Sequence, residues 1–217
     1  SLAITKHQKD FFEKLIKDYL KDPSCSVQKV SLLTPSEKQQ LLIEWNDTQQ
    51  SYPENKMIHQ LFEEQVKKTP DTLAVVYEDQ ELTYKQLNEK SNQLAHYLRS
   101  LGVGPDTLVA IAVERSLEMI IGLLGILKAG GAYVPLDPEY PQDRLQFMIE
   151  DTQAFVLITQ EHLTERFKSY SGKIVDLQFQ EETKELLIKE VSFKKGTLTS
   201  TERQTLSETS THNPISI

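Results

Sequence analysis

The 217-residue sequence is poor in the residues that build covalent or metal-held scaffolds. It has a single cysteine, Cys25. One cysteine cannot form an internal disulfide framework or a cysteine-based zinc site, and histidines spread along a chain do not have the spacing of metal ligands. The five scattered histidines are His7, His59, His96, His162 and His212. We therefore expect no metal site, and a fold that depends on its hydrophobic core.

The sequence also lacks a basic patch and a long apolar run. Its 32 Asp and Glu residues outnumber 24 Lys and Arg, for a formal charge of −8 at pH 7, whereas nucleic-acid binding needs a dense cationic surface. The longest strongly apolar stretch, Met119 to Leu127, is far shorter than the roughly 20 residues that cross a bilayer. Residues 1–21 are charged throughout, unlike an export signal. We expect a soluble, cytoplasmic protein that binds neither nucleic acid nor membrane.

The first 56 residues predict helices followed by a linker. Between residues 6 and 20, apolar side chains recur at helical spacing with charged residues between them. Thr34 has the position of an N-cap, and Glu37 completes a capping box for a second helix. Residues 49–56 are polar and contain a proline, which indicates a linker and a domain boundary.

From residue 57 to 177, predicted strands alternate with predicted helices. The apolar runs 108–113 and 154–159 are typical of strands that are covered on both faces. Units of strand, helix and strand imply right-handed crossovers, so the predicted fold class is α/β with a mostly parallel sheet and flanking helices. Nine of the sixteen residues 197–212 are Ser or Thr. We therefore expect a poorly structured tail over residues 178–217.

Two segments are more specific than this general pattern. They are Leu82–Leu87 (LTYKQL) and Leu127–Leu145 (LKAGGAYVPLDPEYPQDRL). In the second segment, Gly130 or Gly131 is expected to end a helix in the left-handed conformation and to allow close passage of the next strand. Asp137 is expected to accept backbone N–H groups in the turn, and Arg144 to pair with a nearby carboxylate, Glu139 or Asp143. These are structural roles.

In order and spacing, the two segments resemble the first two core motifs of the adenylation domains of nonribosomal peptide synthetases. These domains belong to the adenylate-forming superfamily, which includes acyl-CoA synthetases. Trp45–Thr48 and Ile58–Glu63 resemble the junction that joins a condensation domain to an adenylation domain. The resemblance covers roughly residues 30 to 177.

The resemblance implies a domain layout in four parts. Residues 1–30 correspond to the C-terminal helix of a condensation-like domain, residues 31–56 to a linker, and residues 57–177 to a partial N-terminal adenylation subdomain. Residues 178–217 form the tail. The expected fold is thus an incomplete N-terminal subdomain of the adenylate-forming fold, preceded by an α-helical linker segment.

The resemblance also implies an activity for the parent protein. The parent would activate an amino acid with ATP and Mg²⁺ as aminoacyl-AMP, and load it onto the phosphopantetheine of a carrier protein. Its partners would be the upstream condensation domain and the remaining adenylation and carrier domains. The chain lacks the family's phosphate-binding loop, which ends in Pro-Lys-Gly, and its catalytic lysine. We therefore assign no catalytic, cofactor-binding or metal-binding residue and expect the chain to be inactive alone.

Two other interpretations stay open. The chain is also interpretable as a non-catalytic interaction or remnant fragment that associates through its exposed sheet edge and its first helix. A third interpretation is a piece of an acyl- or aryl-CoA ligase of the same superfamily, although the second segment and the junction favour the peptide synthetase branch.

The remaining candidate residues carry little functional signal, with one exception. Glu114 and Arg115 follow a buried strand, at the edge where ligands of α/β proteins bind, so they are a candidate substrate contact or else part of an ion pair. The others are expected to have packing, linker or solvated roles. They are His59, His96, Trp45, the carboxylate pairs Glu63–Glu64 and Glu181–Glu182, and the loops Ser171–Lys173 and Lys194–Gly196, which lack the glycine spacing of a phosphate cradle.

Overall fold

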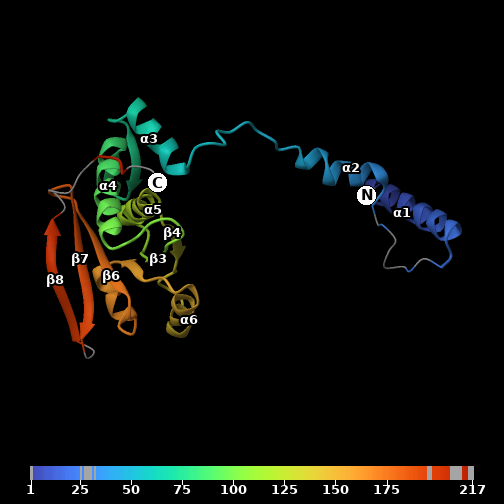
Figure 1. Ribbon diagram of the computed structural model, residues 1–217. Helices are drawn as coiled ribbons and strands as arrows, with labels where there is room; N and C mark the ends of the chain where they lie inside the picture. Colours follow the sequence, from blue (N-terminus) through green and yellow to red (C-terminus); the bar gives the residue numbers. More distant parts are fainter. Residues whose placement is uncertain are drawn as a thin grey trace. The chain divides into compact units, whose positions relative to one another are not determined.

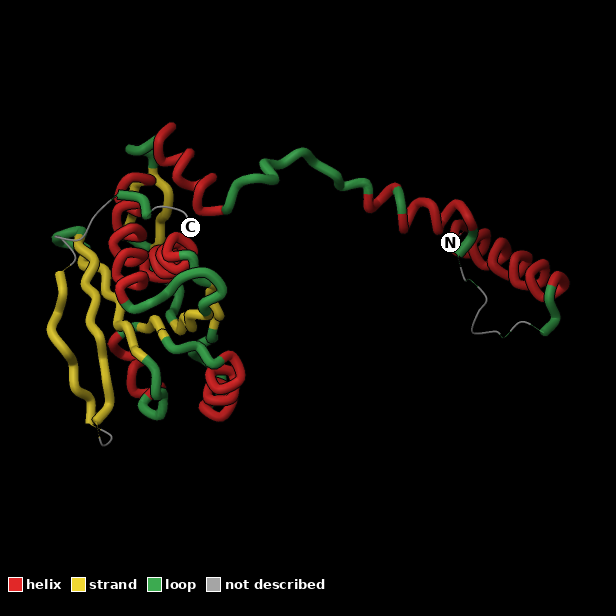
Figure 2. Tube along the Cα trace, viewed as in Figure 1, coloured by secondary structure: helices red, strands yellow, loops and turns green. Residues whose placement is uncertain are grey.

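The computed structural model describes residues 2–24, 26, 31, 33–194, 197–205 and 212–214. The chain divides into two compact units, Ser1–Glu54 and Asn55–Ile217 (Figures 1 and 2). This division falls within the linker expected over residues 31–56. Cys25 and the end of the loop Lys194–Gly196 lie outside the described residues.

The described part of the first unit consists of helical elements with exposed apolar side chains. Its elements are α1 (Leu2–Lys21), α2 (Pro35–Leu42) and the 3₁₀ helix η2 (Glu44–Asn46). The predicted capping box at the start of α2 is confirmed, because the Thr34 N–H donates to Glu37 Oε2 at 2.8 Å and the Glu37 N–H donates to Thr34 Oγ1 at 3.3 Å. On α1, the side chains of Phe12, Ile16 and Tyr19 stay more than half exposed.

The second unit contains the sheet. Its helices are α3 (Ile58–Lys68), α4 (Tyr84–Ser100), α5 (Leu117–Ala129), α6 (Gln142–Thr152) and the 3₁₀ helix η3 (Glu161–Phe167). Its strands are β1 (Leu73–Tyr77), β2 (Gln80–Thr83), β3 (Leu108–Ala112), β4 (Ala132–Pro135), β5 (Val156–Thr159), β6 (Lys173–Gln180), β7 (Glu185–Lys194) and β8 (Thr197–Thr205). Strands β1 and β2 form a small antiparallel sheet of their own.

The main sheet has the strand order β4-β3-β5-β6-β7-β8. The four strands β4, β3, β5 and β6 run parallel, and β7 and β8 are added antiparallel (Figure 1). Helices cover both faces of the parallel part. Val109 and Ile111 of β3 belong to the core with α4 and α5, whereas Ala110 and Ala112 belong to the core with α6 and η3. Burial on both faces explains why the β3 sequence is an uninterrupted apolar run.

The expected poorly structured tail differs from the structure. Strand β6 continues to Gln180, and β7 and β8 pair in register over most of their length. Leu186 and Ile188 of β7 are almost completely buried, so this segment contributes to the core. Threonine is β-branched and favours strands, so the Thr-rich composition of β8 suits an antiparallel edge strand as well as it suits disorder. Residues 206–211 and 215–217 lie outside the described part.

The turn between α5 and β4 depends on two adjacent glycines. Gly130 has φ 96°, the left-handed conformation that ends α5. At Gly131, an added Cβ would lie 2.9 Å from Val103 Cγ1 and 3.1 Å from the Thr107 carbonyl oxygen. The sequence left open which glycine is left-handed, and the structure assigns this role to Gly130 and the close approach to Gly131.

Helices α4 and α5 also pack through a glycine. A Cβ at Gly125 would lie 2.6–3.0 Å from three side-chain atoms of Leu94, including its Cβ. We predict that Gly125→Ala lowers the free energy of unfolding by about 1–3 kcal/mol, because Leu94 is fully buried and cannot move aside. Gly104→Ala is the control, since nothing lies within 4 Å of its added Cβ. Urea unfolding measures both, and equal effects would contradict the packing argument.

A buried carboxylate lies between β6 and β7. Asp176 is 1% exposed and lies opposite Lys189, whose Nζ is 3.7 Å from Asp176 Oδ2. Its Oδ1 has no hydrogen-bond partner among the described residues. Burial raises the pKa of Asp176 to about 6, against the opposing effect of Lys189. The folded protein therefore binds more protons than the unfolded chain between about pH 4 and pH 6, and the free energy of unfolding falls as pH rises through that interval.

We predict that Asp176→Asn removes this pH dependence. Relative to the natural chain, the variant gains stability as pH rises from about 4 to 7, by up to about 3 kcal/mol, because it has no buried charge to form. Urea unfolding at several pH values measures the difference, with the exposed Asp151→Asn as the control for loss of one carboxylate. A difference between natural chain and variant that does not change with pH would contradict the account.

Candidate functional site

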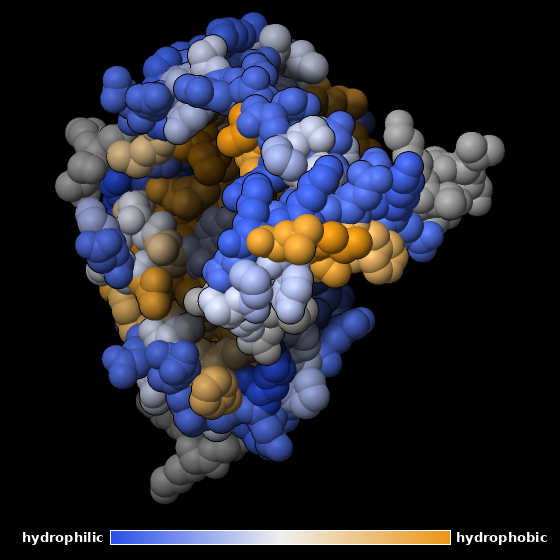
Figure 3. Space-filling view, turned by 90° about the vertical axis from the view of Figure 1, so that its right-hand side faces the viewer, coloured by the Kyte–Doolittle hydropathy of each residue, from blue (hydrophilic) through white to orange (hydrophobic). Residues whose placement is uncertain are grey.

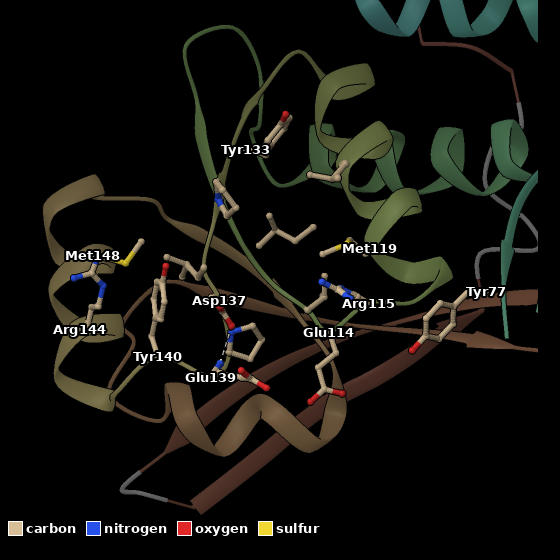
Figure 4. A pocket seen from close by; sticks show the side chains of 16 residues that line it. Tyr77, Glu114, Arg115, Met119, Tyr133, Asp137, Glu139, Tyr140, Arg144 and Met148 are labelled. Carbon is tan, nitrogen blue, oxygen red and sulfur yellow. Dashed lines mark hydrogen bonds between the residues drawn. The ribbon is translucent and has the colours of Figure 1, made fainter. Parts of the chain in front are cut away.

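An open cavity of about 860 Å³ lies at the carboxyl ends of β3 and β4 (Figure 4). Parallel strands bring their carboxyl ends to the same edge of a sheet, which is where α/β proteins bind ligands. The space-filling view shows a hollowed part of the surface with hydrophobic residues at the bottom (Figure 3). The cavity is therefore the candidate site that the topology favours.

The cavity has an apolar floor and a charged rim. Ile111 and Val113 from β3 and the loop after it, together with Met119 from α5, provide apolar surface. The charged lining residues are Glu114, Arg115, Asp137, Glu139 and Arg144. Figure 4 shows Tyr140, Arg144 and Met148 on one side of the cavity and Arg115 and Tyr77 on the other.

Glu114 and Arg115 lie where the sequence placed them. Both are exposed and line the cavity at the end of β3. The Glu114 carboxylate lies 3.3 Å from His162 Nε2, and the backbone N–H of Glu114 donates to Gln160 Oε1 at 2.9 Å. Glu114 thus contacts His162, a partner that sequence spacing did not indicate, and a strand-end ion pair of Glu114 and Arg115 stays a prediction. A substrate contact for this pair stays a prediction.

The loop after β4 forms much of the rim. As predicted, Asp137 Oδ1 accepts the Glu139 N–H at 2.9 Å, which closes the turn. The prediction for Arg144 is wrong, because its guanidinium lies 4.9 Å from the centre of the Tyr140 ring and, within the described residues, forms no ion pair with Glu139 or Asp143. A cation over an aromatic face is stabilised by the ring quadrupole, and an (i, i+4) contact was available at the start of α6.

Arg166 holds this loop and was missed by the sequence analysis. It extends from η3 and donates to the carbonyl oxygens of Pro138 and, at 2.7 Å, Tyr140. Gln142 Nε2 donates in return to the Arg166 carbonyl oxygen at 2.5 Å. The acceptors are backbone atoms more than twenty residues away, so no side-chain pattern in the sequence indicates the contact.

Lys128, near the start of the segment Leu127–Leu145, is buried. Its side chain is fully covered, its Nζ lies 2.5 Å from Glu63 Oε1, and it donates to Asn88 Oδ1 at 2.9 Å. Burial lowers the pKa of Lys128, while Glu63 opposes this shift. The pair joins α5 to α3 and α4. A buried ion pair of this kind is costly to break because the remaining charge is left uncompensated.

The carboxylate pair Glu63–Glu64 therefore does not act as a unit. Glu63 faces Lys128, whereas Glu64 pairs with Lys56 at 2.5 Å. The expectation that both are solvated is wrong for Glu63. Nearby, His59 is 8% exposed, and burial lowers its pKa, as suits the packing role predicted for it.

The other candidates also lie away from the cavity. Glu181 and Glu182 are exposed, and Glu181 accepts from Gln80 Nε2 at 3.4 Å. A Cβ at Gly172 would lie 2.5 Å from the Phe155 carbonyl oxygen, so close packing accounts for this glycine. Among the described residues, no group of three or more His, Cys, Asp or Glu side chains could hold a metal ion. No helix in the described part of the chain is both long enough and apolar enough to cross a membrane.

The cavity rim does not fit a triphosphate. Phosphate sites need converging backbone N–H groups or an excess of cations. Here the two arginines, Arg115 and Arg144, are accompanied by three carboxylates, and Arg144 lies against Tyr140. The N–H of Glu139 is used by Asp137 in the turn. The charged groups described at this rim therefore do not form a phosphate-binding donor set.

Comparisons with known proteins place the chain in a family. Residues 62–215 match the family described as AMP-binding enzyme. Tyrocidine synthase 3 of Brevibacillus parabrevis is 51% identical over 163 residues, which are 75% of this chain and 2% of that protein. Gramicidin S synthase 2 of Brevibacillus brevis is 52% identical over 152 residues, which are 70% of this chain and 3% of that protein. The chain thus spans only a few per cent of these relatives' lengths.

Solved structures agree with the expected fold. The nonribosomal peptide synthetase FmoA3 aligns with a TM-score of 0.58 at 30% identity, over 75% of this chain and 18% of that chain. A four-domain nonribosomal peptide synthetase bound to AMP and glycine aligns with a TM-score of 0.65 at 24% identity, over 81% of this chain and 13% of that one, and supports the fold alone. The expected α/β fold class is confirmed. Because the family match covers most of its length, this chain belongs to the AMP-binding enzyme family, as an N-terminal part of a nonribosomal peptide synthetase adenylation domain.

Proposed function

We propose that the chain contributes to amino-acid activation as a part of a larger adenylation domain. The whole domain would join an amino acid to AMP with ATP and Mg²⁺ and pass it to the phosphopantetheine of a carrier protein. Support comes from similarity to tyrocidine synthase 3 and gramicidin S synthase 2. It also comes from the cavity at the carboxyl ends of β3 and β4, whose rim includes the loop after β4.

The proposed contribution of this chain is structural. Lys128 and Glu63 join α5 to α3, and Arg166 holds the loop Pro138–Tyr140 at the rim. These contacts fix the position of one wall of the cavity. The chain's own residues thus position a surface, and the groups that bind phosphate would come from other parts of the parent.

We further propose that the first unit belongs to the junction with a condensation domain. Residues 1–30 would be the last helix of that domain and residues 31–56 the linker. The exposed apolar side chains of α1 and the 65% exposed Trp45 suit contacts with such a neighbour. The remaining adenylation and carrier domains are the other proposed partners, and the charged composition of the chain favours a cytoplasmic location.

The alternative of a non-catalytic interaction fragment depends on the free sheet edges. On β4, the N–H groups of Ala132 and Leu136 face β3, so alternation turns the amides of residues 133 and 135 outward. Residue 135 is proline and has no N–H, which leaves Tyr133 as the outward donor. A proline on an edge strand disfavours pairing with another chain. The β4 edge therefore argues against association at that side, while β8 is the other edge strand of the sheet among the described residues.

The proposal predicts different results for the isolated chain and for a chimera. Alone, the chain is expected to give no amino-acid-dependent ATP–pyrophosphate exchange. In the chimera, the matching part of this chain replaces the corresponding 163 residues of tyrocidine synthase 3. Its exchange rate is expected to stay within about tenfold of that of natural tyrocidine synthase 3, since both segments would form the same wall of the cavity. A folded but inactive chimera would favour the interaction or remnant interpretation, and exchange with acyl or aryl acids would favour the ligase alternative.

The loop contacts predict a difference between Arg166 and a nearby exposed cation, Lys168. In the chimera, Arg166→Met removes the donors to Pro138 and Tyr140 and is expected to lower exchange by about ten- to a hundredfold, because a displaced wall misplaces reacting groups. Lys168→Met is the control, since Lys168 is exposed next to η3 and is not among the residues that line the cavity, and it is expected to cost less than about threefold. Equal losses from the two substitutions would contradict the assigned role of Arg166.

A further inference from the structure

Three polar residues form a stripe along one face of α4. Asn88, Asn92 and His96 are spaced four residues apart, so their side chains lie above one another on the helix. Asn92 is completely buried. All three contact the short segment His212–Pro214, which is more than one hundred residues away in the sequence.

The contacts centre on one side chain. Asn213 Oδ1 accepts from Asn88 Nδ2 at 3.1 Å and from Asn92 Nδ2 at 2.9 Å. His96 Nε2 lies 2.9 Å from the His212 carbonyl oxygen, which can only accept. Pro214 follows and is buried. The segment is thus held by the Asn213 side chain and by the His212 carbonyl group.

Lys128 determines which way each amide faces. The nitrogen and oxygen of an asparagine side chain are assigned from their partners. A lysine ammonium can only donate, so the atom of Asn88 that faces Lys128 Nζ at 2.9 Å must be Oδ1. Asn88 Nδ2 then donates to Asn213, so the accepting atom of Asn213 must be Oδ1. The same oxygen also accepts from Asn92. The buried ammonium therefore sets the direction of the whole hydrogen-bond chain.

We propose that Asn88, Asn92 and His96 form a binding site for a chain segment that carries an acceptor oxygen on its side chain. Residues 212–214 occupy this site, which we call the α4 acceptor site. Lys128 is its positioning residue, because it holds Asn88 with the amide nitrogen toward the segment. The site returns the chain after β8 to the helix layer and fixes it there. The cavity at β3 and β4 plays no part in it.

The rate of thiol modification at position 214 tests this proposal. In the full chain with Cys25→Ser and Pro214→Cys, a buried thiol reacts only when the segment leaves α4. Asn213→Ala removes the acceptor and is expected to raise the reaction rate about tenfold or more, since two hydrogen bonds are lost. Asn213→Asp keeps an acceptor oxygen and is expected to stay within about twofold of the parent rate, or to fall below it.

A second substitution tests whether the direction of the hydrogen bond from Asn88 to Asn213 matters. Asn88→Asp keeps the acceptor for Lys128 but replaces the donor to Asn213 with an oxygen, so it is expected to raise the rate about five- to tenfold. Combined with Asn213→Ala, it is expected to add little, because both substitutions break the same contact. Circular dichroism melting of each variant shows that the fold is intact.

Three results would overturn the proposal. The first is an unchanged rate in the Asn213→Ala variant. The second is an equal increase in the Asn213→Asp and Asn213→Ala variants, which would show that the acceptor oxygen does not hold the segment. The third is a double variant whose increase in reaction rate equals the product of the increases in the Asn88→Asp and Asn213→Ala variants. That result would show that the two residues act on separate events.

Discussion

The parallel pairing of β4, β3, β5 and β6 is the constraint on which the rest of the second unit depends. Parallel strands need crossover connections, and these place α5 on one face of the sheet and α6 on the other. The same pairing brings the ends of β3 and β4 to one edge, so the charged residues after β3 and the proline-containing loop after β4 face a common cavity. The location of the candidate site thus follows from strand direction before any side chain is considered.

The residues of the two motif segments and the junction act mainly on each other and on the backbone. Gly130 and Gly131 allow α5 to end and β4 to pass closely, Lys128 forms a buried pair with Glu63, and Asp137 closes its own turn. Each of these groups is therefore committed to a contact within the fold. A sequence motif that is specific enough to identify a family can thus be made of residues whose task is to position a wall.

The sequence predicted well those features that depend on local spacing. Capping by Thr34, the left-handed glycine after α5 and the strand covered on both faces at β3 all involve residues within a few positions of each other. Features that need distant partners were not predictable in this way. Arg166 binds carbonyl groups of a loop more than twenty residues earlier, and Asn88 meets Asn213 only in the folded chain.

In the tail, the sequence predicted less structure than the folded chain has. Composition suggested disorder after Gln178, whereas β7 and β8 extend the sheet because β7 buries Leu186 and Ile188 against the core that α4 and α5 complete. Serine and threonine content is ambiguous between a solvated edge strand and a disordered segment, and only the antiparallel partner decides between them. The sequence was ambiguous at Glu63 for a similar reason. Two adjacent carboxylates are expected to be solvated, and only the folded chain shows that the buried Lys128 lies opposite Glu63.

We propose that this part of the chain forms the wall of a nucleotide-binding domain and that the groups that hold a triphosphate lie elsewhere in the parent protein. Isothermal titration calorimetry of the purified chain with ATP and Mg²⁺ tests it most directly. The account predicts no saturable heat at millimolar nucleotide. A saturable isotherm with one nucleotide bound per chain would contradict it.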